Sequence, residues 1–349
     1  MQHVVSNRTT LPILSNVLIE AKDGRLRLTT TDLDVGVSGS VEAEVLKEGS
    51  TTLPAKRLVS IIRELPSAEV EISIDAKNVA KITSGPSFFK ILGLPHDEFP
   101  PLPSFNDAKE YRIPQDMIKE ALKKTSYSIS NDETRYVLNG IFISFSEGKM
   151  TLVATDGRRL AMVENELEFP ATHDTEIIIP TKAIQELARL AGTEGEILTK
   201  LQDNQISFEV NDTIIVSKLI EGNYPNYRQV IPGEKKERLD LNREAFFETV
   251  RRVSLLSSEK SNSVKLIFGP DTLDVTANSP DIGEAKETMA VKYSGPEFSI
   301  AFNPDFLMAP LRALSEEELH LDLIDEMSPG VLRAAGNFLY VLMPMRVTN

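Results

Sequence analysis

The sequence predicts an α+β protein built from three tandem copies of one module. First, similar segments begin at Asn16, Asn139 and Asn262, which stand 123 residues apart. Second, each segment alternates apolar and polar residues on both sides of a glycine-containing turn, a pattern typical of a β-hairpin. Third, each copy later has an apolar strand that runs into a proline and then a helix. Hairpins and helices that recur in this order favour the α+β class.

The three hairpins are expected at Asn16–Asp32, Asn139–Asp156 and Asn262–Asn278. The first two turns contain Asp-Gly at positions 23–24 and Glu-Gly at positions 147–148, and the third contains Gly-Pro-Asp. Glycine suits such turns because it adopts positive φ at low steric cost.

Apolar residues at three-to-four spacing predict five helices. Three of them follow an apolar strand in each module, and in these a proline stands at the first turn, where its missing N–H would be unpaired anyway. The other two open the second and third modules, whereas the matching point of the first module falls before residue 1. Met1–Ser6 therefore reads as the tail of a helix whose beginning is absent, so the first module is expected to be truncated. The expected helices are Pro54–Leu65, Pro114–Ser126, Pro180–Ala191, Arg243–Ser254 and Pro304–Leu314.

Proline-rich extended segments predict the module boundaries. Phe99–Pro103 separates the first two copies, and the segment from Tyr224 to Lys236 separates the last two. Such segments are typical of domain junctions. The expected modules are 1–108, 109–236 and 237–349.

Composition limits the class of protein. The 349 residues include no cysteine, which excludes disulfides and thiolate metal sites and fits a reducing compartment. No apolar run reaches the 18 or more residues of a membrane span, and no signal-peptide pattern opens the chain. A soluble cytoplasmic protein with no membrane partner is expected.

Charge is unevenly divided. The net charge is −14, yet the five expected helices carry 12 basic and 7 acidic residues. For one helix a solvated face explains this, but five helices on repeated modules would share one surface. A common basic face favours sequence-independent contacts with phosphates, with the acidic remainder repelling nucleic acid elsewhere.

No constellation of catalytic residues is present. There is no glycine-rich phosphate loop, dinucleotide fingerprint or nucleophile elbow. The Thr-Asp pairs that end at Asp32 and Asp156 follow hairpin strands, which favours a turn or capping role over a carboxylate dyad. The histidines lack metal-ligand spacing, so neither a metal nor a cofactor is expected. They are His3, His96, His173 and His320.

Five motifs carry a resemblance that runs the length of the chain. They are Arg8–Asn16, Glu133–Gly140, Ala154–Ala161, Glu221–Arg228 and Tyr340–Arg346. In this combination and order the chain resembles the bacterial DNA polymerase III β subunit family, the sliding clamps.

The resemblance implies a fold and a function. Clamps of this family are head-to-tail homodimers, with helices of six modules lining a hole and antiparallel sheets outside. The ring encircles duplex DNA without sequence preference and gives the polymerase processivity. It is a non-catalytic subunit of a complex whose DNA-directed DNA polymerase activity lies elsewhere. The implied partners are the polymerase III α subunit, clamp-loader subunits, and other polymerases and repair proteins with clamp-binding peptides.

The resemblance also implies a hydrophobic groove for partner peptides. Arg158 stands where a histidine is common, and Gln229 where an arginine is common, which affects the fine specificity of the groove. From the residues alone, the last segment could equally be an ordinary edge strand. The implied groove residues are Leu138, Thr155, Gly157, Arg158, Arg159, Leu160, Pro225, Val230, Asn303, Phe306, Met327, Val341, Leu342, Met343, Pro344, Met345 and Arg346.

Two further sets follow from the resemblance. Val137 stands where some relatives have a second tyrosine, so stacking on a base is not supported there. The implied DNA-binding residues are Arg8, Lys56, Arg57, Arg135, Tyr136 and Lys182. The implied dimer interface joins Phe89 and Ile91 to Leu255 and Leu256 of the neighbouring subunit, and the alternative is that these four belong to the core of their own modules.

Two hypotheses from other classes remain beside the clamp. One is a repeat enzyme that acts on phosphorylated substrates through its basic helices. The other is a monomeric structural repeat without nucleic acid. A dimer in sedimentation and retention on circular DNA would favour the clamp.

Overall fold

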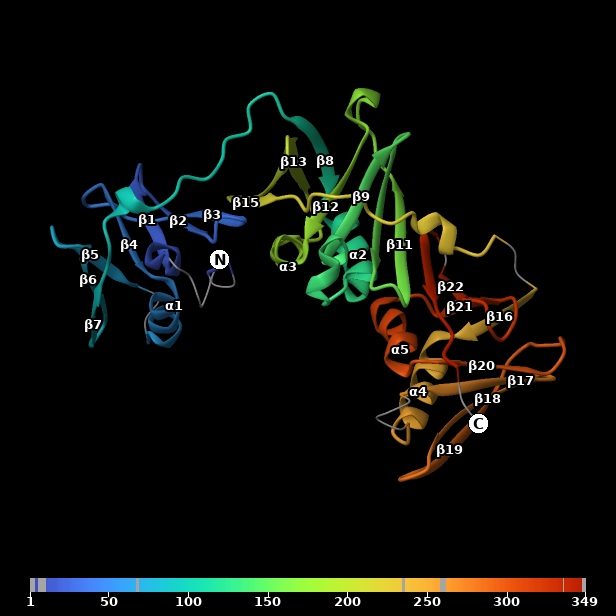
Figure 1. The fold of residues 1–349 in the computed structure, drawn as a ribbon. Helices are drawn as coiled ribbons and strands as arrows, with labels where there is room; N and C mark the ends of the chain where they lie inside the picture. Colours follow the sequence, from blue (N-terminus) through green and yellow to red (C-terminus); the bar gives the residue numbers. More distant parts are fainter. Residues whose placement is uncertain are drawn as a thin grey trace. The chain divides into compact units, whose positions relative to one another are not determined.

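The chain folds into two compact units of helices and antiparallel sheets, as a computed structural model shows (Figure 1). Unit 1 consists of residues 1–118 and 182–219, and unit 2 of residues 119–181 and 220–349. The α+β prediction is confirmed. The structure describes residues 4–5, 11–66, 69–233, 236–257, 262–334 and 336–346.

Unit 1 contains an eight-stranded antiparallel sheet with the strand order β4-β1-β2-β3-β15-β14-β13-β8. Its central pair joins strands distant in sequence, because Val37 of β3 lies opposite Ile215 of β15. The elements are η1 (Pro12–Ser15), β1 (Asn16–Lys22), β2 (Arg25–Thr31), β3 (Val35–Glu42), β4 (Gly49–Pro54), β8 (Lys109–Pro114), β13 (Glu196–Gln202), β14 (Gln205–Val210) and β15 (Thr213–Lys218).

A smaller sheet, β5-β6-β7, and helix α1 complete the N-terminal part of unit 1. Helix α1 buries Ala55 and Leu58 in one cluster with Leu53 of β4 and Ile82 of β6. Helix α3 belongs to unit 1 from its second residue, Lys182, onward. The elements are α1 (Ala55–Glu64), β5 (Glu71–Ile74), β6 (Val79–Ser84), β7 (Ser87–Leu92), η2 (His96–Glu98) and α3 (Thr181–Leu190).

Unit 2 contains a second eight-stranded antiparallel sheet, with the order β12-β9-β10-β11-β23-β22-β21-β16. Strand β23, at the end of the chain, pairs with β11, so that Leu160 lies opposite Val341. The elements are η3 (Ser126–Ser128), η4 (Glu133–Leu138), β9 (Gly140–Ser146), β10 (Lys149–Thr155), β11 (Arg159–Glu166), η5 (Ala171–His173), β12 (Thr175–Pro180), η6 (Tyr227–Val230), β16 (Glu237–Asn242), β21 (Glu318–Leu323), β22 (Gly330–Ala334) and β23 (Phe338–Leu342).

Helices α4 and α5 pack against each other in unit 2, and α4 also packs on the sheet β19-β18-β17-β20 (Figure 1). Phe246 of α4 is fully buried, as are Phe268 and Phe302 of the sheet. Helix α2 begins in unit 1 and continues in unit 2. The elements are α2 (Gln115–Thr125), α4 (Arg243–Ser254), β17 (Val264–Gly269), β18 (Thr272–Ser279), β19 (Gly283–Ala290), β20 (Phe298–Phe302) and α5 (Pro304–Ala313).

The three predicted hairpins are confirmed as the antiparallel pairs β1–β2, β9–β10 and β17–β18. The first turn has positive φ at Asp23 (49°) and Gly24 (71°), and the second at Glu147 (54°) and Gly148 (72°). Two successive positive φ values match the twist of the flanking strands. Glycine at the second position therefore lowers the strain of each turn.

The five predicted helices are also confirmed, with one correction to how they begin. Pro54, Pro114 and Pro180 are the last residues of β4, β8 and β12 and do not open the helices that follow. Pro54 takes the cap position of α1, and only Pro304 stands inside the first turn of its helix. A proline fixes φ near −65°, which suits both a strand end and a helix start.

Most of the expected helix tail at Met1–Ser6 lies outside the described residues. Val4 and Val5 are described, and they lie in a turn and a bend and are buried. For these two residues the expectation of helix was wrong. The burial of these two apolar side chains is favourable both in a helix and in the observed turn.

The two compact units divide the chain differently from the three expected modules. The β3–β15 pair joins strands of the first and second modules, and the β11–β23 pair joins strands of the second and third. These hydrogen-bonded strand pairs cross the expected module boundaries and join part of one module to part of the next. The expected boundaries stay a prediction.

Candidate functional site

One face of the unit 2 sheet carries a row of side chains that are direct cross-strand partners. Thr155 of β10 lies opposite Leu160 of β11, which lies opposite Val341 of β23, which lies opposite Val331 of β22. Direct partners in an antiparallel pair project from the same face. These four side chains therefore form one strip, here called the cross-strand row. Its three apolar members are each 2% exposed and belong to one buried cluster.

The linker that follows β15 covers part of this face with two tyrosines. Tyr224 stacks on Phe142 of β9 with ring centroids 5.0 Å apart, and the Tyr227 ring lies 5.8 Å from the same phenylalanine. Burial raises the pKa of both tyrosines, so their hydroxyls stay neutral. The neighbouring Pro225 and Val230 remain exposed. The linker thus covers part of the apolar face with Tyr224 and Tyr227 and leaves Pro225 and Val230 exposed beside it.

The loop between β10 and β11 is held by its own side chains. Asp156 Oδ1 accepts hydrogen bonds from the backbone N–H groups of Arg158 (2.9 Å) and Arg159 (3.1 Å). Thr155 Oγ1 accepts one from the N–H of Gly157, whose φ is +84°. Asp32 forms the same turn in the first hairpin. The predicted turn role of both aspartates is confirmed.

Arg159 links this loop to helix α5. Its Nε donates to Asp156 Oδ2 at 3.0 Å, and its guanidinium lies 4.2 Å from the centroid of the Phe306 ring. Tyr340 Oη donates to the Phe306 carbonyl at 2.8 Å, and Asn303 Oδ1 accepts from the Phe306 N–H at 3.2 Å. A cation over an aromatic face is attracted by the ring quadrupole. Arg159 and Phe306 therefore hold each other in place.

The C-terminal segment after β23 is tied on both sides by its backbone. Met343 N donates to the Arg158 carbonyl at 3.0 Å, and Met345 N donates to the Ala301 carbonyl of β20 at 2.7 Å. These bonds hold the segment Met343–Arg346 beside the Arg158 loop.

The predicted groove residues divide into floor and rim. Leu160 and Val341 form the floor, and Leu342 is buried on the other face of β23, because successive strand residues alternate. The apolar rim is exposed at Met343 (43%) and Val230 (47%). Methionine at such a rim adapts to apolar side chains of different shape.

Two further predicted groove residues, Leu138 and Met327, are not among the residues of the buried cluster that contains Leu160 and Val341. Leu138 is buried at the end of η4, whereas its neighbour Val137 packs against the cluster. Met327 is 62% exposed in the β21–β22 loop.

Sequence reasoning missed Val331, Tyr224 and Tyr227. Alternation in the strand 330–334 marks Val331 as a face residue, but only the register with Val341 shows which face it shares. The tyrosines lie in a proline-rich linker, where no periodic pattern identifies buried residues.

The predicted DNA-binding residues lie in different surroundings. Lys56 and Arg57 are exposed on the first turn of α1 and have no ion pair among the described residues. Tyr136 of η4 is 58% exposed. Arg135 donates Nε to Asp132 Oδ2 at 3.0 Å, and a Cβ on Gly157 would lie 2.8 Å from Arg135 Nη1. Arg135 therefore lies beside the loop between β10 and β11.

Lys182 is half-buried, because its ammonium group pairs with Asp32 and donates to the Val4 carbonyl at 2.6 Å. Several other helical cations are paired within the chain, which lowers the charge they offer to a partner. These pairs are Lys124–Glu316, Arg189–Glu186, Arg251–Glu248 and Arg252–Glu287. Arg8 lies outside the described residues.

The residues predicted for a dimer interface lie on or beside sheet and helix ends. Phe89 and Ile91 of β7 pack against the core of the first module, whereas Phe88 and Leu92 on the opposite face are 60% and 70% exposed. Leu255, after α4, is 77% exposed. The fourth, Leu256, is half-buried.

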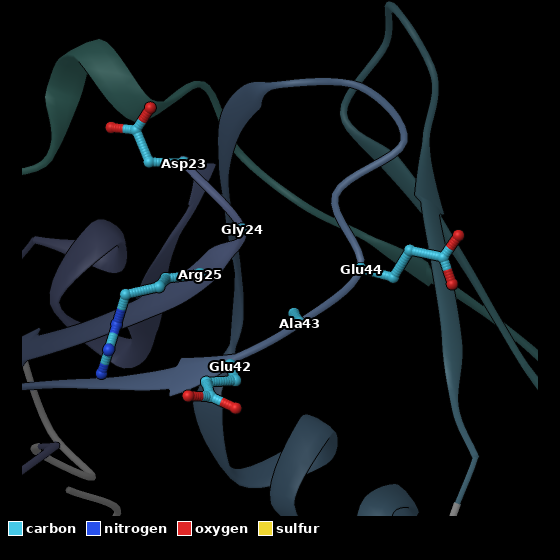
Figure 2. A pocket seen from close by; sticks show the side chains of 6 residues that line it. All are labelled: Asp23, Gly24, Arg25, Glu42, Ala43 and Glu44. Atoms are coloured by element: carbon cyan, nitrogen blue, oxygen red, sulfur yellow. The ribbon is translucent and has the colours of Figure 1, made fainter.

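A hollow at the β1–β2 hairpin contains none of the predicted residues. It has a volume of about 620 Å³ and is lined by the β1–β2 turn, the first residue of β2, the last residue of β3 and the two residues that follow β3. In Figure 2 the carboxylates of Asp23, Glu42 and Glu44 point in different directions. Arg25 pairs instead with Asp212 at 3.1 Å. In the described residues no three or more histidine, aspartate or glutamate side chains group as metal ligands, and no helix is long and apolar enough to cross a membrane.

Family models match almost the whole chain. They describe the DNA polymerase III beta subunit: its N-terminal domain matches residues 1–103, its central domain 112–226 and its C-terminal domain 228–346.

Curated relatives and solved structures that resemble this chain are also beta sliding clamps. The beta sliding clamp of Chlamydia pneumoniae is 38% identical over 99% of this chain and 95% of its own. That of Escherichia coli K12 is 34% identical over 98% and 94%. The Bartonella birtlesii clamp bound to griselimycin has a TM-score of 0.94 and 36% identity, covering 99% of this chain and 95% of that one. The Bacillus subtilis clamp has a TM-score of 0.93 and 29% identity over the same shares.

Proposed function

Because the chain belongs to the DNA polymerase III beta subunit family and is a non-catalytic processivity clamp, we propose that two copies close head to tail into a ring around duplex DNA. The ring would contain six modules, with the boundaries expected at 108/109 and 236/237. Its helices would face the DNA and its sheets the solvent. Cytoplasmic replication machinery is the setting that this function requires.

The partner groove is the best-supported part of the proposal. The floor residues Leu160 and Val341 share a buried cluster with Tyr227 of the linker, and the backbone of the Met343–Arg346 segment is hydrogen-bonded to the Arg158 carbonyl. An apolar floor with an adaptable rim suits a short peptide with apolar anchors. Peptides of the polymerase III α subunit, clamp-loader subunits, other polymerases and repair proteins would compete for it.

The remaining expected groove residues would border this floor. Arg158 and Arg159 would meet the polar groups of the peptide backbone. Leu138 and Met327 stay in the proposed set on the family resemblance alone.

DNA would be held by phosphate contacts from exposed helical cations. Lys56 and Arg57 are the best placed, because they are exposed and unpaired in the described part. Arg135 and Tyr136 would act near the groove. Lys182 would contribute less than a free lysine because Asp32 neutralises its charge.

Edge strands would close the ring. Strands β7 and β19 are edges of their sheets, and an exposed edge offers unpaired backbone groups to another chain. The exposed Leu255 lies at the end of α4, which packs on β19. Leu255 and Leu256 would meet β7 of the second copy, with Phe89 and Ile91 beneath it.

Retention on DNA tests the ring. Clamp loaded onto a nicked circular plasmid should stay through gel filtration, and cutting the plasmid once should release it from the free ends. Sedimentation should give a particle of about twice 38.7 kDa. Equal loss from circle and linear DNA, or a strict monomer at micromolar concentration, would contradict the ring.

A further inference from the structure

The cross-strand row continues beyond the proposed groove into a charged pocket. Val331 lies opposite Asp322 of β21, which lies opposite Arg238 of β16. The pocket has a volume of about 220 Å³ and includes Val331, so it borders the apolar floor directly. Its lining is Pro232, Gly233, Arg238, Asp322, Ile324, Pro329, Val331 and Arg333.

Two guanidinium groups converge on one carboxylate in this pocket. Arg238 donates to Asp322 through Nε (2.5 Å) and Nη2 (2.7 Å), and Arg333 donates through Nε (3.1 Å). The Asp322 side chain is 8% exposed, whereas the arginines are 36% and 37% exposed. The hydrogen bonds to Asp322 raise the pKa of Arg238, which keeps it charged. The three groups together carry a charge of +1.

The two guanidinium groups, on side chains that are 36% and 37% exposed, have further donors. Arg238 Nη1 and both Nη atoms of Arg333 have no partner among the described residues. In the next row of the same face, Asp240 is already engaged by His320 at 2.7 Å. Arginine presents a planar fork that matches a carboxylate. The pocket therefore has the charge and geometry to take a second carboxylate beside Asp322.

We propose that this arginine pocket binds a carboxylate of the partner peptide that occupies the groove. Neighbouring strands lie about 4.8 Å apart, so the three steps from Leu160 to Asp322 span roughly 14 Å. An extended peptide covers about 3.3 Å per residue. An acidic residue three to five positions from the apolar anchor would reach Arg333. The inference rests on the proposed groove and adds an acidic specificity to it.

Synthetic peptides test this. The probes are fluorescein-labelled, amidated peptides with two leucine anchors and one glutamate three, four or five positions away on either side, each with a glutamine counterpart. Fluorescence anisotropy at low salt should show one position at which glutamate binds about five- to tenfold tighter than glutamine, because a charge-assisted bond forms. The preference should shrink at 0.5 M salt.

Two variants locate the effect. Arg333→Gln should abolish the preference for glutamate and leave binding of the glutamine peptide unchanged, since Arg238 still holds Asp322. Arg25→Gln is the control, because Arg25 is a half-exposed arginine paired with the Asp212 carboxylate and both residues belong to unit 1, whereas the pocket belongs to unit 2. It should keep the full preference. A peptide that ends in a free carboxylate at the preferred position, compared with its amide, shows whether a C-terminal carboxylate is also accepted.

The outcomes separate the two proposals. Binding of glutamate and glutamine peptides with equal affinity at every position would overturn the arginine pocket and leave the groove. Failure of all peptides to bind would overturn the groove and the pocket with it. The wild-type comparison decides the question even if Arg333→Gln does not fold.

Discussion

At the scale of single residues, Asp32 and Asp156 show which part of a site can be predicted from sequence. In both, one carboxylate oxygen holds the turn through local N–H groups, as the Thr-Asp pattern predicts. The other oxygen takes a cation, Lys182 in the first case and Arg159 in the second. Lys182 is 150 residues from its partner, and no local pattern identifies such a pair.

The exposed rim of the groove provides a residue-scale prediction. Leu160→Ala would remove a buried side chain and cost about 2–5 kcal/mol of stability, which would obscure any effect on binding. Met343→Ala is cleaner, because the side chain is exposed. Its loss should weaken binding of a polymerase III α peptide about five- to tenfold, measured by anisotropy, with the dimer intact. Met117→Ala on α2 is the control, and equal weakening by both would place the peptide elsewhere.

Glu316 provides a prediction of how the stability of the fold depends on pH. Burial alone would raise the pKa of this carboxyl, but hydrogen bonds from Lys124 Nζ and from backbone N–H groups hold it below its ordinary 4.5. A carboxyl with a lowered pKa in the folded state stabilises that state above its unfolded pKa, and this is lost as pH falls through the folded value. Glu316→Gln should therefore lower the free energy of unfolding by about 1 kcal/mol at pH 7. The difference should shrink as the pH falls from 5 to 3.

Urea unfolding at pH 7, 5 and 3 measures this difference. The matched control is Glu318→Gln, an exposed carboxylate on β21 with no ion pair among the described residues. It should change stability little at any pH. A deficit in Glu316→Gln that persists unchanged to pH 3 would show that shape, not charge, makes the contact.

At the scale of elements, period and turn chemistry account for what was predicted correctly. Alternation around Asp23-Gly24 and Glu147-Gly148 identifies the hairpins, and three-to-four spacing identifies the helices. Which edge strand stays open is set by tertiary pairing. The family resemblance implied Phe89 of β7 for the interface, but this side chain packs against the core, whereas Phe88 and Leu92 on the opposite face of the strand are exposed.

The exposed leucine after α4 provides an element-scale prediction. Leu255→Lys should convert the proposed dimer into monomers at micromolar concentration, because it places a charge in an apolar contact between chains. Sedimentation velocity would record the change in mass. Leu46→Lys is the control, because Leu46 is 84% exposed in a loop outside the proposed contact. A Leu255→Lys protein that remains as dimeric as the control would remove this residue from the interface.

At the scale of the whole molecule, spacing predicts the modules but not how their sheets join. The 123-residue repeat is visible in the chain, whereas the pairs β3–β15 and β11–β23 depend on contacts between strands far apart in sequence. The second pair brings Val341 beside Leu160 and so creates the floor of the proposed groove. The proposed groove thus depends on pairing between strands of different expected modules, which is why only the family resemblance pointed to it beforehand.

If the ring encircles DNA, its retention on a circle should not depend on contacts between its cations and the phosphates. In a variant with both Lys56→Gln and Arg57→Gln, equilibrium binding to short linear duplex should weaken, and the slope of log K against log salt should fall by about 1–2 units. The half-life on a nicked circle should match that of the wild type, because a closed ring does not need these contacts to stay on. Arg112→Gln and Lys109→Gln, on strand β8, form the control pair and should change neither measurement. Faster loss of the Lys56→Gln, Arg57→Gln variant from the circle, with the dimer intact, would show that retention depends on phosphate contacts and would contradict a topological clamp.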